Sequence, residues 1–147
     1  TLFFYLATVN TPAMALEIPG VGSQYAFTSR DGTGAYLDGS NTYKLNIPAN
    51  PPAQKFWSFV VYDPQTRSML QSGEMPYPSK NNKRNADMVK NADGSIDLYF
   101  GPAAPAGMEA NWVKTVPGKG WFGIFRLYGP GQEWFDRTWK LGDIEKI

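Results

Sequence analysis

The feature that most constrains the fold is an aromatic block over residues 56–139, which short turns interrupt repeatedly. Its segment 56–62 is apolar on both faces, as expected of a central strand that is covered on each side. Residues 96–100 alternate between apolar and polar, and 121–128 form a second long apolar segment. Aromatic residues are 15% of the chain and favour strands, while 15 Gly and 12 Pro supply turns. The pattern predicts an all-β protein.

We expect a single antiparallel β-sandwich domain over residues 1–147, jelly-roll-like, with about eight strands. Residues 1–20 are interpreted as a lead-in segment with a strand at 2–7. Because the chain begins with Thr1 rather than Met, we expect it to follow an upstream domain that is missing here. The last element, over 132–140, is expected to be a short helix or turn in which Trp134 and Phe135 pack down.

Other strands are predicted between these landmarks, separated by turns and by a long polar loop. The strands are expected at 24–28, 36–37, 42–47 and 68–70, and the loop at 72–91. The core is predicted to contain large apolar residues of the strands: Leu45, Trp57, Phe59, Val61, Leu98, Phe100, Phe125 and Leu127.

Two missing residue types restrict the chemistry, because the chain has no His and no Cys. Without them there is no Ser-His-Asp triad, no thiolate nucleophile, no disulfide and no histidine-rich metal site. We therefore predict no cofactor and no metal.

The net charge and the length of the apolar runs indicate which partners and which cellular compartments are compatible with the chain. A net charge of +1 argues against a nucleic-acid partner, and the longest apolar run, 2–9, is too short to span a membrane. Periplasm, secretion and cytoplasm are all compatible with the sequence, which does not indicate an oligomeric state.

Acidic and basic clusters have structural interpretations that we prefer. A hydrolase would need two carboxylates about 5–9 Å apart, or Tyr and Lys as catalysts, but most acidic residues lie in Asp-Gly or Asp-Pro turns. The segment 91–97 spaces oxygen side chains as a calcium loop does, but a β-turn explains it better. A solvated loop is preferred to a phosphate site for the basic cluster of Lys80, Lys83, Arg84 and Lys90.

Arg126 stands out because it lies in a strand that is otherwise apolar. A buried arginine needs a partner, so we expect an ion pair with Asp63 or Asp93, with an anion-binding role as the alternative. Together with Asn111 these residues are expected to form a polar network at a strand end, which could also be the floor of a ligand pocket. On this basis Arg126→Ala should cost a few kcal/mol and Lys83→Ala very little.

Tryptophans are the second kind of candidate ligand contact, because their rings can stack against sugars or aromatic ligands. Trp57 and Trp121 lie in predicted strands and are assigned to the core. Trp112 follows Asn111 in a predicted loop and is the better candidate for exposure. The predicted ligand-binding residues are Trp112, Asn111, Arg126, Asp63 and Asp93, and no catalytic residue is assigned.

A series of short motifs, in order, resembles the bacterial family named "domain of unknown function 1214". The motifs are Tyr43-Lys44-Leu45, Phe56-Trp57-Ser58, Tyr62-Asp63, Asn91 with Asp93-Gly94-Ser95, Gly101-Pro102, Asn111-Trp112, Pro117-Gly118-Lys119-Gly120-Trp121 and Arg126-Leu127-Tyr128-Gly129-Pro130. The resemblance implies a jelly-roll-like sandwich, the C-terminal half of a protein whose N-terminal half is also of unknown function. It implies no activity.

The function expected from these observations is non-catalytic. The domain is expected to bind a small molecule or glycan, or to support a partner domain. The alternative is a hydrolase that acts on a carbohydrate or an ester.

Overall fold

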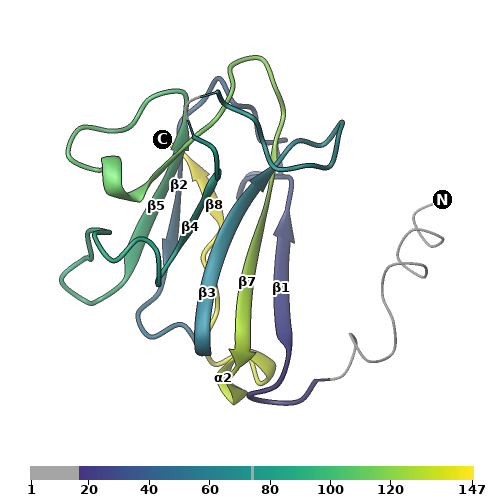
Figure 1. Cartoon of the computed structure of the whole chain (residues 1–147), viewed down its shortest axis with the longest axis vertical. Coiled ribbons are helices and arrows are strands. Elements are labelled where there is room, and N and C mark those ends of the chain that lie inside the picture. Colours follow the sequence, from purple (N-terminus) through teal and green to yellow (C-terminus); the bar gives the residue numbers. More distant parts are fainter. Residues whose placement is uncertain (1–16, 74) are drawn as a thin grey trace.

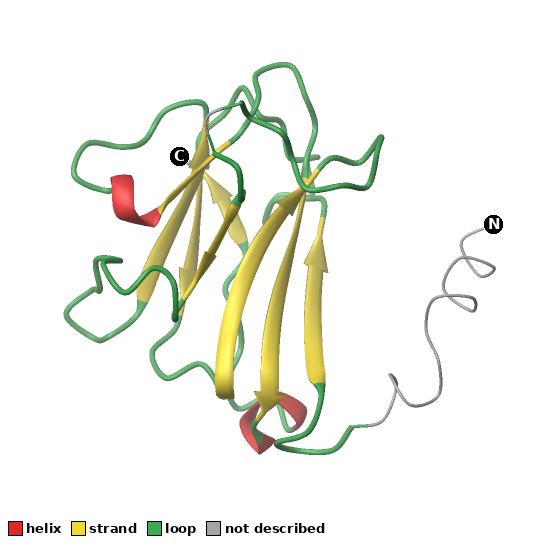
Figure 2. Cartoon of the chain, in the orientation of Figure 1, coloured by secondary structure: helices red, strands yellow, loops and turns green. Residues whose placement is uncertain are grey.

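The computed structural model describes residues 17–73 and 75–147 and consists of two four-stranded sheets packed around one core (Figure 1). The first sheet has the strand order β1 (Ser23–Thr28), β7 (Phe122–Pro130), β3 (Ala53–Tyr62), β4 (Ser79–Asn81). The second has the order β6 (Trp112–Lys114), β5 (Ile96–Gly101), β2 (Tyr43–Ile47), β8 (Ile144–Lys146). Helix in the described residues is limited to two single turns, η2 (Glu109–Asn111) and α2 (Gln132–Phe135) (Figure 2). The predicted all-β sandwich is confirmed.

Antiparallel pairing holds both sheets together with one exception. β7 lies between β1 and β3 and is antiparallel to both, and β2 lies likewise between β5 and β8. The exception is β6, which pairs with β5 in parallel. The second sheet is therefore mixed at this edge, while the other strand pairs of the two described sheets are antiparallel, as predicted.

Period-two alternation explains how the strands build the core. In β2 the residues Tyr43, Leu45 and Ile47 are buried, while the residues between them are half-buried on the outer face. Phe59 of the first sheet meets Phe100 of the second with ring centroids 4.8 Å apart. All eight predicted core residues are buried, and each contributes roughly 1.5–3 kcal/mol to folding.

Several elements differ from the sequence prediction because tertiary pairing overrides local pattern. The predicted loop 72–91 contains β4, whose polar residues pair with the edge of β3 through the backbone. The strands β6 and β8 were not predicted, whereas 36–37 and 68–70 form only isolated bridges. The short helix or turn predicted over 132–140 is one helical turn, Gln132–Phe135, followed by a turn. The predicted strand at 2–7 lies outside the described residues.

No helix among residues 17–73 and 75–147 combines the length and the apolar character that crossing a membrane requires.

Candidate functional site

Asp63 closes the end of β3 and is paired with a lysine. Its side chain is 3% exposed. Lys119 Nζ donates to Oδ2 at 2.5 Å, and the backbone amides of Gln65 and Thr66 donate to Oδ1 at 2.8 and 3.4 Å. The hydrogen bond from Lys119, followed by the bond from the Gln65 amide, holds the pKa of Asp63 below its ordinary value of 3.8. Asp63 thus anchors a turn and an ion pair.

This lowered pKa predicts a pH dependence that Asp63→Asn removes. A carboxyl group whose pKa is lower in the folded state stabilises the fold above its unfolded pKa. That stability is lost as the pH falls through the folded pKa. We expect the free energy of unfolding of the wild type to fall more steeply than that of Asp63→Asn between about pH 5 and about pH 2. Urea titrations across this range measure both slopes, and equal slopes would contradict the assignment.

Arg126 has neither of its predicted carboxylate partners. It lies at the middle of β7 on the outer face of the sheet, half-buried, and its Nη2 donates to the hydroxyl of Tyr62. Asp63 pairs with Lys119 instead, and within the described chain no salt bridge joins Arg126 to Asp63 or Asp93. The prediction of a network centred on Arg126 is wrong. With no buried ion pair to break, the loss of a few kcal/mol expected for Arg126→Ala has no physical basis.

Asp93 is an exposed turn residue. Its Oδ1 accepts hydrogen bonds from the amide of Ser95 at 2.9 Å and from the Ser95 hydroxyl at 2.7 Å. The hydroxyl bond is the larger cause of the lowered pKa of Asp93, and the amide bond is next. Gly94 follows with a φ of 84°, which favours glycine in this turn. The β-turn interpretation of 91–97 is confirmed, and the described residues contain no group of three metal-ligating side chains.

Asn111 and Trp112 both form hydrogen bonds to the backbone at the second sheet. Asn111 is 1% exposed, and its amide accepts from the backbone of Val89 and donates to the carbonyls of Val89 and Asp97. Trp112 is the first residue of β6, not a loop residue, and its Nε1 donates to the carbonyl of Gly101 at 3.0 Å. Half-buried and bonded in this way, Trp112 is a poorer stacking surface than its predicted loop position implied.

The structure therefore does not gather the five predicted residues at one site. Asp63 and Arg126 belong to the first sheet, whereas Asp93, Asn111 and Trp112 belong to the second. No hydrogen bond or ion pair found in the described chain joins any two of them.

The basic cluster is also not uniformly solvated. Lys80 is 7% exposed, and burial lowers its pKa against the opposing effect of Asp87. It lies opposite Phe59, on the inner side of the sheet. The solvated-loop interpretation is wrong for Lys80, although Lys83 and Arg84 are exposed.

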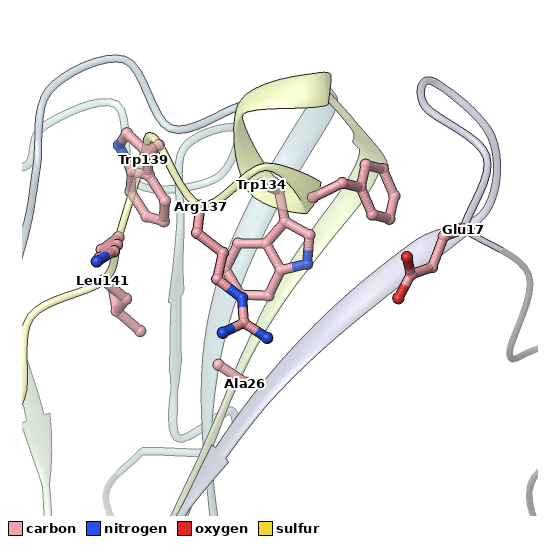
Figure 3. A pocket seen from close by; sticks show the side chains of 8 residues that line it. Glu17, Ala26, Trp134, Arg137, Trp139 and Leu141 are labelled. Carbon is pink, nitrogen blue, oxygen red and sulfur yellow. The ribbon is translucent and has the colours of Figure 1, made fainter.

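An aromatic hollow at the α2 end of the molecule is a candidate site for a ligand (Figure 3). It has a volume of about 460 Å³ and combines tryptophan rings with charged side chains. Its lining residues are Glu17, Ala26, Trp134, Phe135, Arg137, Trp139, Lys140 and Leu141. In Figure 3 the indole of Trp134 and the guanidinium of Arg137 both extend toward Ala26 of β1. We call this site the Trp134 hollow.

One wall of the Trp134 hollow is fixed by the core. The ring of Trp139 lies 6.0 Å from Phe125 and 6.3 Å from Trp134, measured between centroids. Its Nε1 donates to the carbonyl of Ala49 at 3.1 Å, which fixes the orientation of the indole. A preformed aromatic wall lowers the entropy lost when a ligand binds.

A turn after α2 brings Arg137 to the hollow. Asp136 Oδ1 accepts from the amide and hydroxyl of Thr138 at 3.0 and 2.8 Å. Arg137, between them, has a φ of 61°, a left-handed conformation that few residues other than glycine adopt and that clusters at binding sites. Sequence reasoning missed this site because it extended the helix to residue 140. The Asp-x-Thr turn at 136–138 was the available signal.

Two further hollows have different linings. One, of about 530 Å³, lies over the outer face of β2 and β5 and includes the carboxylates of Asp93, Asp97, Asp143 and Glu145. The other, of about 610 Å³, is bordered mainly by apolar residues, Phe27, Tyr36, Trp121 and Phe122 among them, and by Arg67. The first has no aromatic ring in its lining, and the second has one charged residue, Arg67, where the Trp134 hollow has three.

Comparison with known proteins identifies the family. The family model described as "Protein of unknown function (DUF1214)" matches residues 22–132, which is more than half of the chain. The chain belongs to this family. The family match confirms the resemblance carried by the sequence motifs, but its description assigns no activity.

The solved structure of the VPA0106 protein supports the fold. The VPA0106 protein from Vibrio parahaemolyticus is similar with a TM-score of 0.74 and 23% identity, over 97% of this chain and 33% of that one. An uncharacterised protein from Burkholderia cenocepacia matches with a TM-score of 0.49 and 19% identity, over 87% of this chain and 35% of that one. The chain spans about a third of the length of each of these proteins. Comparison with the curated proteins gives no match.

Proposed function

We propose that this chain is a non-catalytic binding domain that takes a glycan in the Trp134 hollow. The observation that carries the proposal is the combination of aromatic rings and charged side chains around one hollow. Sugars offer apolar C–H faces that pack on indole rings, and hydroxyls that need hydrogen-bond partners. Trp134 and Trp139 supply the rings, and Glu17, Arg137 and Lys140 supply donors and acceptors.

The volume and position of the hollow support this assignment. About 460 Å³ lies within the range of small-ligand sites, and a short oligosaccharide can extend beyond an open rim. Asp136 and Thr138 hold the turn that carries Arg137, so the backbone from which this charged side chain extends is fixed before a ligand arrives. A preformed backbone of this kind lowers the entropy lost on binding.

The hydrolase alternative has less support. A glycosidase needs one carboxylic acid whose pKa is raised so that it can protonate the leaving oxygen. Hydrogen bonds instead lower the pKa of Asp93, the residue of the polar hollow for which a shift is resolved. They also lower those of Asp31, Asp38 and Asp63. Ionised carboxylates suit turn anchors better than general acids.

Replacing Trp134 by alanine tests the proposal. Calorimetric titrations with cellohexaose, chitohexaose and oligogalacturonate are expected to show binding of at least one of them to the wild type. The Trp134→Ala variant should bind that sugar about fivefold more weakly, since one stacked ring contributes about 1 kcal/mol. Arg137→Ala, which changes an exposed side chain, should also weaken binding.

Trp112→Ala is the matched control, because it removes a half-buried tryptophan of the second sheet. It should leave the sugar affinity unchanged. Binding of none of the three sugars, or equal losses in the Trp112 and Trp134 variants, would contradict a glycan site at this hollow.

A further inference from the structure

The outer face of the first sheet, which points away from the core, carries aromatic residues, and its described strands place no acid there. Alternation places the core residues Trp57, Phe59 and Phe125 on the inner face, so their neighbours in sequence lie outside. The outward residues of the described strands β1, β3, β4 and β7 are Ser23, Tyr25, Phe27, Phe56, Ser58, Val60, Tyr62, Ser79, Asn81, Phe122, Ile124, Arg126 and Tyr128. Arg126 is the one charged residue among them.

Arg126 lies near the centre of this face, and no salt bridge to it is found among residues 17–73 and 75–147. Across the sheet it is opposite Tyr25 on one side and Ser58 on the other. Its guanidinium carbon is 5.8 Å from the ring centroid of Tyr25 and 5.7 Å from that of Tyr62. These contacts, with the hydrogen bond to Tyr62, hold the guanidinium along the face.

The hydrogen-bonding capacity of Arg126 is largely unused. A guanidinium has five N–H donors and is always protonated. One donor meets the hydroxyl of Tyr62, but the buried Nε–H of Arg126 has no acceptor in the described part of the chain. A half-buried cation without a counter-ion is unfavourable, and a carboxylate that accepts two parallel N–H bonds is the group that fits its planar fork.

Exposed rings border the guanidinium on the side of the edge strand β1. Tyr25 is 52% exposed and Phe27 is 63% exposed, and Phe27 contacts Phe122 with centroids 5.2 Å apart. Exposed aromatic patches on soluble proteins commonly mark binding surfaces. The rings offer an apolar surface directly beside an unpaired positive charge.

We propose that this face binds a small aromatic carboxylate, with the carboxylate on Arg126 and the aromatic ring against Tyr25 and Phe27. The site lies on β1 and β7, is separate from the Trp134 hollow, and does not depend on glycan binding there. A ligand of this class supplies both things the face lacks, a negative charge and a partner for its exposed rings. Reorientation of the guanidinium on binding would bring the buried Nε–H of Arg126 to the carboxylate.

Titration with phenylacetate and with phenylacetamide, its neutral amide, tests the site on the full chain. Phenylacetate is expected to bind at least about tenfold more tightly, and about 0.5 M NaCl should reduce this difference. Arg126→Gln should abolish the preference. Arg126→Lys should reduce it, because lysine keeps the charge but not the planar fork. Arg84→Gln, a change of an exposed arginine beside Tyr77, should leave it intact.

A measurement on the wild type keeps the test decisive if an Arg126 variant does not fold. In isotope-labelled protein, phenylacetate should shift the Nε–Hε NMR signal of Arg126, and phenylacetamide should not. Equal affinity for the two compounds, or an unmoved Arg126 signal, would overturn the proposal.

A second pair of probes distinguishes a small molecule from a protein partner. The peptide Ac-Phe-Glu-Phe-NH₂ and its glutamine counterpart carry the same chemistry on a peptide backbone. Binding of phenylacetate that depends on Arg126 supports the proposal whether or not the peptide binds. Binding of the acidic peptide alone would overturn the assignment to a small molecule and point to a protein ligand.

Discussion

Asn111→Ala is expected to lower the free energy of unfolding by about 3 kcal/mol. The side chain of Asn111 makes three hydrogen bonds of 2.7–2.8 Å to the backbones of Val89 and Asp97 while it is 1% exposed. Alanine would leave those three backbone groups without their partner at a position where the Asn111 side chain is itself almost inaccessible to water. Each such group costs roughly 1 kcal/mol or more. Urea denaturation of the two proteins measures the difference.

Asn46→Ala is the control for this prediction. Asn46 is half-buried on the outer face of β2, and its amide bonds only the side chains of Ser95 and Asp97. Because water can replace these bonds, its loss should cost under about 1 kcal/mol. If Asn111→Ala lowered the free energy of unfolding by no more than Asn46→Ala does, the hydrogen bonds of Asn111 to Val89 and Asp97 would not stabilise the fold as the structure indicates.

Gly39→Ala is expected to destabilise the domain by about 3 kcal/mol or more. A Cβ atom at Gly39 would lie 2.1 Å from the carbonyl oxygen of Val116 and 2.8 Å from its carbonyl carbon. Backbone cannot rotate away as a side chain can. Gly39 is also tied from both sides, because its amide donates to the carbonyl of Lys119 and its carbonyl accepts from the hydroxyl of Thr115. Thermal and urea unfolding should both register the loss.

Gly32→Ala is the matched substitution in the neighbouring turn. A Cβ at Gly32 would meet Asp143 Cβ at 3.4 Å, an ordinary contact, so the change should stay within about 0.5 kcal/mol. Similar free energies of unfolding for the two alanine variants would contradict the prediction. They would show that the segments containing Gly39 and Val116 can move apart without loss of stability.

The partners of the predicted site residues could not be predicted from the sequence. Asp63, Asp93 and Arg126 were grouped because each is polar beside an apolar strand, but sequence does not say which strand ends meet. Register and sheet order place Asp63 next to Lys119 and Arg126 beside Tyr25 and Tyr62. Lys119 was not considered as a partner because it lies in a turn 56 residues away from Asp63.

The Trp134 hollow was missed for a related reason. The sequence prediction treated 132–140 as one short helix or turn in which Trp134 and Phe135 pack down, and it did not locate where a helical turn would end. Hydrogen bonds to Asp136 and the left-handed Arg137 end the helix early, and contact with Phe125 then fixes Trp139 as a wall.

The sequence by itself determined the all-β class, the positions of the long strands and the core. Strand alternation and turn residues act over a few neighbours, so they can be read without knowing which segments meet. Tertiary structure alone decided the parallel β6, the short β4 and β8, the partner of Asp63 and the unpaired charge of Arg126. These depend on contacts between segments far apart in the chain, where backbone pairing and shared burial outweigh local preference.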